Sequence, residues 1–138
     1  MDPAPTHWFS HEKLEVYQES INFIAWRSTL LESAGRVGDV RDQLARASTS
    51  IPLKIAEGNG KYALKDRCRF FDIAHGSALE CADGLDVLVA KQKLTSDSVR
   101  PGKESLQRIV QMLIGLIKRN STREYERTEG PERAGDAA

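Results

Sequence analysis

The sequence contains few cysteines, no excess of either charge and no long apolar run. Its two cysteines, Cys68 and Cys81, fit neither a disulfide framework nor the paired spacing of a structural zinc site, so we expect both to pack as small apolar side chains. Lys and Arg together number 20, and so do Asp and Glu. This balance excludes a global attraction to nucleic acid or to an acidic membrane, and any electrostatic binding must be local.

Membrane and secretion signals are also missing. No stretch approaches the roughly 18 consecutive apolar residues of a membrane-spanning helix. The start, "MDPAPTHWFS", has neither the basic lead nor the apolar core of a signal peptide. We therefore expect no membrane partner and a cytoplasmic location. The length of 138 residues suits one domain, and we expect an extension over 1–9, a helical domain over 10–127 and a disordered tail over 128–138.

Apolar residues recur at steps of three and four along most of the chain, which is the helical period. The first expected helix begins with Ser10 as N-cap, has Phe9 and Leu14 as a hydrophobic staple, and stops at Gly35. Its expected core stripe comprises Leu14, Tyr17, Ile21, Ile24, Ser28 and Leu31. A second stripe, made of Val16, Phe23 and Leu30, lies on another face that a single bundle would leave partly exposed. We therefore predict a subunit interface at this second stripe.

Three further helices are expected. The second begins at Asp39 as N-cap, and Gly58 and Gly60 offer left-handed stops. Its expected core residues are Val40, Leu44, Ala47, Ile51 and Ile55. The third buries Phe71, Ala74, Ala78, Cys81, Leu85 and Leu88, and it contains Gly76 and Gly84, where we expect another backbone to approach closely. The fourth starts around Pro101 and carries Leu106, Ile109, Leu113, Leu116 and Ile117 on its apolar side.

The stretch "STSIPLKIAEGNGK" (48–61) allows two interpretations, a phosphate-binding loop or the end of a helix. A Walker-type loop needs glycine where the chain has Ile55 and a hydroxyl where it has Tyr62, and the spacing before Gly58 is helical. We therefore interpret the stretch as a helix that contains Pro52. The proline either kinks this helix or sits in the first turn of a new helix capped by Ser50, and we expect Pro52 and Gly76 at a subunit interface.

No catalytic or metal-binding set can be assembled from the three histidines. His7 and His11 have metal-pair spacing only if one helix covers both, and His75 is expected in the core or at an interface. We expect no enzyme activity, no cofactor and no metal. Charge is instead organised in blocks, because residues 36–69 carry eight basic and four acidic groups, whereas 70–90 carry four acidic and no basic groups. The candidate nucleic-acid contacts are Lys54, Lys61, Lys65, Arg67 and Arg69, with Arg36, Arg41 and Arg46 as further candidates. We expect no clustered exposed aromatic side chains for base stacking.

Four helices joined by short turns predict an all-α, antiparallel up-down four-helix bundle. The sequence also resembles the bacterial four-helix-bundle proteins encoded in intervening sequences of large-subunit ribosomal RNA genes. The segments that carry the resemblance are "LEVYQ" (14–18), "SIPLKIAEGNGK" (50–61) and "RFFDIAHGSALE" (69–80).

The resemblance implies assembly as a ring-like homopentamer. It does not imply a reaction. It also implies a distant similarity to the accessory protein of diversity-generating retroelements, which binds a reverse transcriptase and nucleic acid. Two functional hypotheses follow, a non-catalytic homo-oligomeric scaffold or adaptor and, as the alternative, an RNA- or DNA-binding accessory protein.

Overall fold

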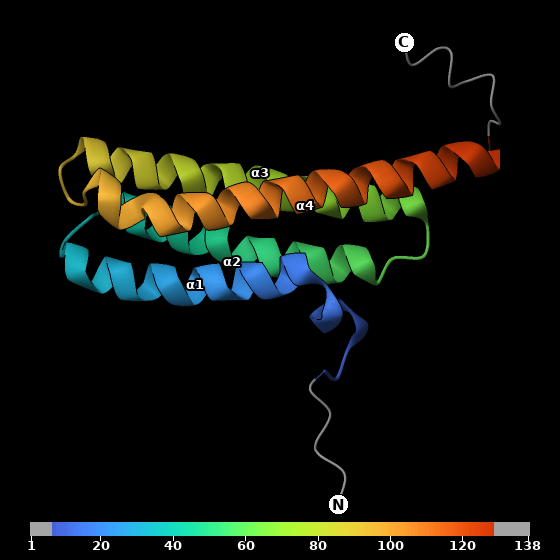
Figure 1. Ribbon diagram of the computed structural model, residues 1–138, viewed down its shortest axis with the longest axis horizontal. Helices are drawn as coiled ribbons and strands as arrows, with labels where there is room; N and C mark the ends of the chain where they lie inside the picture. Colours follow the sequence, from blue (N-terminus) through green and yellow to red (C-terminus); the bar gives the residue numbers. More distant parts are fainter. Residues whose placement is uncertain (1–6, 129–138) are drawn as a thin grey trace, which may run out of the picture.

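A computed structural model describes residues 7–128, with side chains to residue 121, and shows four antiparallel helices packed side by side (Figure 1). The 3-10 helix η1 (Ser10–Lys13) precedes the four long helices, which are α1 (Glu15–Ala34), α2 (Asp39–Asn59), α3 (Leu64–Ala90) and α4 (Ser96–Thr128). This confirms the predicted all-α four-helix bundle. Most of the expected tail lies outside the described residues, but Thr128 still belongs to α4. None of the helices within 7–128 combines the length and hydropathy of a bilayer-spanning segment.

Helix α3 forms the centre of the core and packs most extensively against α2 and α4. All six residues predicted for its buried face are completely buried. The predicted core residues of α2 are buried as well, and Leu106, Ile109 and Leu113 provide the corresponding positions on α4. The sequence identifies these faces correctly because the buried residues at 3-4 spacing, from Val40 to Ile55 on α2 and from Phe71 to Leu88 on α3, are all apolar. The buried Ser48 lies beside this series rather than within it.

Helix α1 faces the core mainly with the stripe predicted for the interface, although Leu31 of the predicted core stripe is also buried and Leu14 and Tyr17 pack against the core. Val16 and Phe23 are buried, with Phe23 only 1% exposed, whereas Ile21 is 43% exposed and Ser28 is exposed. The buried stripe is interrupted by Ser20, whose hydroxyl donates a hydrogen bond to the Tyr17 carbonyl over 2.6 Å. This bond satisfies the hydroxyl within the helix, so that Ser20 can be buried without an unpaired polar group. A serine in the stripe thus concealed the core face.

Two helix starts also differ from the predictions. α1 begins at Glu15 because η1 occupies the residues after Ser10, and the Glu12 carboxylate accepts the backbone N–H groups of Trp8 and Phe9. α4 begins at Ser96, one turn before Pro101. Thr95 and Ser98 cap each other there: the Ser98 N–H donates to Thr95 Oγ1 over 3.1 Å, and the Thr95 N–H donates to Ser98 Oγ over 3.0 Å. The "TSDS" segment (95–98) therefore forms the cap and the first residues of α4.

The ends of α1 and α2 are formed by different means. Gly35 ends α1 with a φ of 72°, as predicted, because a residue without Cβ tolerates this conformation. α2 runs without interruption through Pro52, which is buried, and so no new helix starts at Ser50. Gly58 lies within α2, and Gly60 follows its last residue with a φ of −84°. The predicted left-handed stops at Gly58 and Gly60 are therefore wrong.

Candidate interaction surfaces

The loop between α2 and α3 is fastened to the bundle by Arg67. Its Nη1 donates to the carbonyls of Asn59 (2.8 Å) and Lys61 (3.3 Å), and its Nε donates to Asn120 Oδ1 (3.0 Å). Asn120 is buried on α4, and its amide donates in turn to the Leu116 carbonyl. Arg67 was predicted as a nucleic-acid contact. In the structure its Nη1 and Nε donate to the loop and to α4, so that Arg67 holds this corner together.

Gly58 allows α2 to approach α3 closely at the same corner. A Cβ at this position would lie 2.8 Å from Cε1 of the Phe71 ring and 3.1 Å from Cβ of Phe70. Phe71 is completely buried, and the Arg67 guanidinium lies 5.9 Å from the centre of its ring. The glycine is thus needed for close packing at the crossing of the two helices rather than for a turn.

Three basic side chains surround the neighbouring ring of Phe70. The Lys61 and Lys54 ammonium groups lie 5.0 and 5.6 Å from its centre, and the Arg69 guanidinium lies 5.4 Å from it. Lys54 also forms an ion pair with Glu57 over 3.2 Å. Of the five predicted nucleic-acid contacts, the structure thus brings these three together around one ring. Lys65, the fifth, is exposed near the start of α3.

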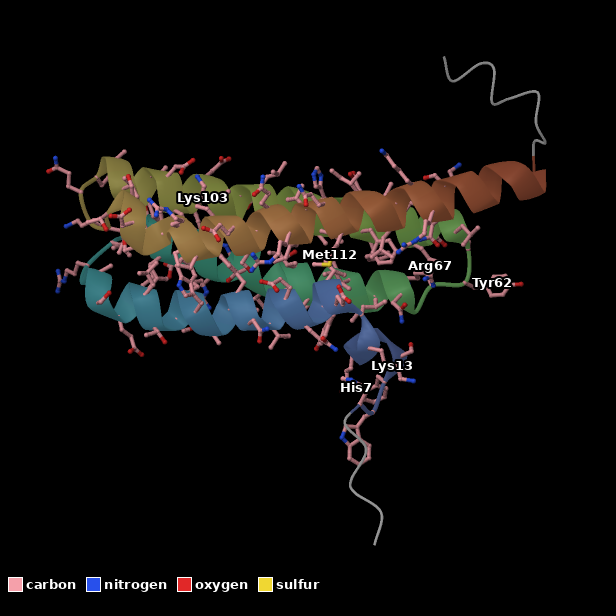
Figure 2. All side chains as sticks on the ribbon, viewed as in Figure 1. His7, Lys13, Tyr62, Arg67, Lys103 and Met112 are labelled. Atoms are coloured by element: carbon pink, nitrogen blue, oxygen red, sulfur yellow. The ribbon has the colours of Figure 1, made fainter. Side chains whose placement is uncertain are left out.

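Tyr62 lies in the same loop and is 95% exposed. In Figure 2 its side chain points away from the end of the bundle, whereas Lys103 lies in the opposite half. The exposed rings of Trp8 and Phe9 belong to the same end, because Asn59 Nδ2 donates to Ser10 Oγ over 2.8 Å and so joins the N-terminal segment to α2. Exposed aromatic rings are therefore present toward this end of the bundle, but among the described residues no ring contact joins Tyr62 to Trp8 or Phe9. No periodic pattern marks these residues, because they lie in a loop and an extension.

The three other candidate arginines are exposed and lie away from this corner. Arg36 lies between α1 and α2, and Arg41 lies in the first turn of α2. Arg46 borders a groove of about 420 Å³ between α2 and α3. Glu80 and Asp83 line the same groove, so that Arg46 lies beside carboxylates of the acidic α3 block. These arginines are poorly placed to extend one continuous basic surface.

A second groove of about 420 Å³ lies between α3 and α4 and is mainly apolar. Ala78, Leu79, Ala82, Leu106 and Val110 line it, and Arg100, Lys103, Glu104 and Gln107 form its polar edge. Leu79 is 46% exposed. Lys103 pairs with Asp86 across the two helices, and Cys68 contacts Ser121 at the far end of the same helix pair. The register between these contacts places Leu79 opposite Val110, and His75 opposite the exposed Ile114.

The predicted subunit-interface residues have different positions. Val16, Phe23 and Pro52 are buried inside the subunit, and Leu30 packs against its core. The prediction is therefore wrong for the α1 stripe, since this stripe is the side of α1 that faces the other helices. Gly76 is exposed, and a Cβ there would have no neighbour within 4 Å, so that the expected close approach is absent within the subunit. At Gly84 the neighbour is the Leu44 side chain rather than a backbone.

Among the described residues, Glu19, Arg27 and Cys81 have shifted pKa values. Glu19 on α1 accepts hydrogen bonds from Ser105 and Arg108 on α4, and the Ser105 bond is the main cause that lowers its pKa. Burial raises the pKa of the Cys81 thiol to about 12. Burial also lowers the pKa of Arg27, whose Nε has no partner among the described groups. Cys81 therefore stays protonated near neutral pH and packs as the predicted small apolar residue.

The remaining candidates have ordinary packing environments. Cys68 is half-buried, and its Sγ lies 3.5 Å from the Ile117 carbonyl. His11 stacks on Phe9, with ring centres 5.9 Å apart, and meets Tyr17 edge-on. His7 and His11 lie outside any common helix, because η1 begins at Ser10. Within residues 7–121, no group of three His, Cys, Asp or Glu side chains could hold a metal ion.

Comparison with known proteins gives a family match and a structural match. A family model described as "23S rRNA-intervening sequence protein" matches residues 12–115. A crystal structure of a protein of unknown function from the S23 ribosomal protein family of Bacteroides thetaiotaomicron is similar, with a TM-score of 0.68 and 21% sequence identity. The match covers 75% of this chain and 98% of the other, and at this identity it supports the fold alone. A comparison with curated proteins finds no match.

Proposed function

Because the chain belongs to the 23S rRNA-intervening sequence protein family, we propose that it acts as a non-catalytic homo-oligomeric scaffold or adaptor. The similar solved structure is described as a protein of unknown function, so that neither comparison supplies a reaction. The proposed assembly is a ring of five subunits, a number that follows from the resemblance of the sequence rather than from the subunit's geometry. The observation in favour of assembly is the exposed apolar groove between α3 and α4.

The groove has the composition of a site for another protein surface. Leu79 and Val110 lie at its centre, and Ile114 continues the apolar strip along α4 with 39% exposure. A helix laid along such a strip would cover apolar side chains at steps of three and four, which is a common mode of helix recognition. The edge carries charges of both signs, Arg100 and Lys103 beside Glu104 and Asp86. Mixed edge charges suit a partner whose surface is also mixed, as in a second copy of this neutral chain.

The experiment is multi-angle light scattering at micromolar concentration. We expect the wild-type chain to give a mass that is a multiple of 15.4 kDa. The Leu79→Glu variant should give a lower mass and keep its helical circular dichroism, because the charge would be buried only at the interface. Leu53→Glu is the matched control, since Leu53 is 56% exposed on α2 and lies outside the groove. A monomeric wild type would contradict assembly, and dissociation by Leu53→Glu alone would place the interface elsewhere.

A further inference from the structure

The corner between α2 and α3 gathers like charges that nothing in the fold requires to be close. Lys54, Lys61 and Arg69 all lie within 5.6 Å of the centre of the Phe70 ring. The face of an aromatic ring attracts a cation weakly at exposed sites, and three cations around one ring repel one another. Glu57 offsets the charge of Lys54 only. Lys61 and Arg69 form no ion pair with any other described side chain, so that a bound anion would relieve their repulsion.

An aromatic side chain projects from the same loop. Tyr62 directly follows Lys61 and is 95% exposed, so that both faces of its ring are open to solvent. Arg67 holds the carbonyls of Asn59 and Lys61, which fixes the loop that carries both residues. An anchored, open ring beside cations provides the two elements used in binding single strands, which are stacking for a base and positive charge for phosphates. Base pairs in a duplex would offer no base face to Tyr62.

We propose that this cationic corner, formed by Lys54, Lys61, Arg69 and Tyr62, binds single-stranded nucleic acid. Phosphate oxygens accept hydrogen bonds from Lys61, Arg69 and Lys54, and one base stacks on the Tyr62 ring. Arg67 supports the site by holding the loop, because its Nη1 donates to the loop carbonyls and its Nε to Asn120. The site is complete within one subunit and therefore does not depend on the proposed assembly. Assembly would only multiply it and add avidity.

The experiment is fluorescence anisotropy of the full chain with a labelled 12-nucleotide oligouridine at low salt. We expect saturable binding that weakens about tenfold between 50 and 200 mM salt, as the release of two phosphates' counterions predicts. The Lys61→Glu, Arg69→Glu double variant should bind at least about tenfold more weakly. Its matched control is Lys91→Glu, Lys93→Glu, which changes the net charge equally at exposed positions beyond α3 and should retain most of the affinity.

Three single substitutions, at Tyr62 and Glu57, test the remaining parts of the site. Tyr62→Ala should weaken oligouridine binding about fivefold or more, and Tyr62→Phe should restore it, because stacking needs only the ring. Glu57→Gln should strengthen binding about twofold, since it removes the carboxylate that pairs with Lys54. These directions would not result from a loss of folding, since the Tyr62 and Glu57 side chains are both exposed.

Several results would overturn the proposal. Equal weakening by the two charge-reversal pairs would indicate a general charge effect, and an unchanged affinity of Tyr62→Ala would exclude stacking. Equal or tighter binding of the corresponding duplex would also contradict a single-strand site. If an acidic peptide displaced the oligonucleotide at equal charge concentration, the corner would instead be a protein-binding surface. None of these results bears on the light-scattering mass, which tests the proposed assembly separately.

Discussion

In each half of the bundle a glycine on one helix packs against an aromatic ring of another helix, but the surroundings of the two rings differ. In the half near the α3–α4 turn, Gly102 faces the Trp26 ring, and a Cβ there would lie 2.2 Å from it. In the half near the α2–α3 loop, Gly58 faces the Phe71 ring in the same way. Trp26 is half-buried, whereas Phe71 is completely buried. Only the second half adds a loop held by Arg67 and a ring surrounded by three cations. The first half therefore carries the charged edge of the α3–α4 groove, with Lys103 paired to Asp86, whereas the second carries cations that lie around one ring.

The largest effect is expected where the Trp26 half joins the core. The Phe23 ring lies 5.6 Å from the Trp26 ring, centre to centre, and is 1% exposed. Phe23→Ala should lower the free energy of unfolding by about 3 to 5 kcal/mol, through lost burial and the cavity left behind. Urea denaturation followed by circular dichroism would measure this change. Ile21→Ala on the exposed side of α1 is the control and should change stability far less; equal losses would contradict the assigned core face.

The next largest effect is a difference between Arg67 and Arg69 in their contribution to the free energy of unfolding. Arg67→Ala would leave the buried Asn120 carbonyl oxygen without its partner and release two loop carbonyls. We expect a loss of about 1 to 3 kcal/mol in the free energy of unfolding. Arg69→Ala should change it by less than about 0.5 kcal/mol, because Arg69 is exposed. The same denaturation measurement compares them, and a larger loss for Arg69 would reverse the roles given to the two side chains.

Gly58 and Gly102 should differ in how much an added methyl destabilises the chain, and the order is the reverse of what the distances alone suggest. An added methyl at Gly102 would be closer to its ring, but it would meet the outer edge of a half-buried tryptophan, which we expect to move aside. At Gly58 the methyl would meet Phe71, which is completely buried and which we expect to shift less. Overpacking costs about 1 to 3 kcal/mol, and alanine regains about 1 kcal/mol of helix propensity.

We therefore expect Gly58→Ala to destabilise the chain by about 1 kcal/mol net and Gly102→Ala to be close to neutral. Gly76→Ala provides the reference for propensity, since its Cβ would meet nothing within 4 Å. Melting temperatures of the three variants would rank them. A lower melting temperature for Gly102→Ala than for Gly58→Ala would show that the tryptophan, rather than the phenylalanine, is the rigid contact.

The smallest effect at neutral pH concerns the two thiols of α3. The half-buried Cys68 should react with iodoacetamide at pH 8, whereas the buried Cys81 should react only after unfolding; mass spectrometry of the labelled chain would show the order. Burial raises the pKa of Cys81 from 9.0 to about 12. Its contribution to stability is therefore complete below pH 9 and decreases as the pH rises towards 12, because the unfolded chain loses the proton first. Cys81→Ala should flatten this alkaline decrease.

The fold was predictable where the apolar period is uninterrupted. The buried faces of α2 and α3 follow directly from their spacing, but the α1 face does not, since Ser20 lies in the middle of it with its hydroxyl bonded to its own helix. The start of α4 was also missed, because "TSDS" suits a turn as well as a reciprocal cap. Where a short sequence pattern is compatible with two local structures, the choice between them depends on the packing of the folded chain.

The candidate sites were predictable only as residue types. The basic block includes Lys54, Lys61 and Arg69, but their arrangement around Phe70 depends on how the α2–α3 loop folds back. The sequence likewise gave no sign that Arg67 supports the loop, since its partner Asn120 lies 53 residues away. The α3–α4 groove depends on the register of two helices, which periodicity alone leaves open.

The proposed assembly and the proposed nucleic-acid binding use separate surfaces of the subunit. Sedimentation velocity of the chain with labelled oligouridine measures both at once. We predict that Leu79→Glu sediments as a smaller species that still binds the oligonucleotide, with only the loss expected from avidity. The Lys61→Glu, Arg69→Glu variant should sediment as the wild-type assembly without bound oligonucleotide. If either variant lost both properties while remaining folded, the groove and the cationic corner would be parts of one surface, and the account would be contradicted.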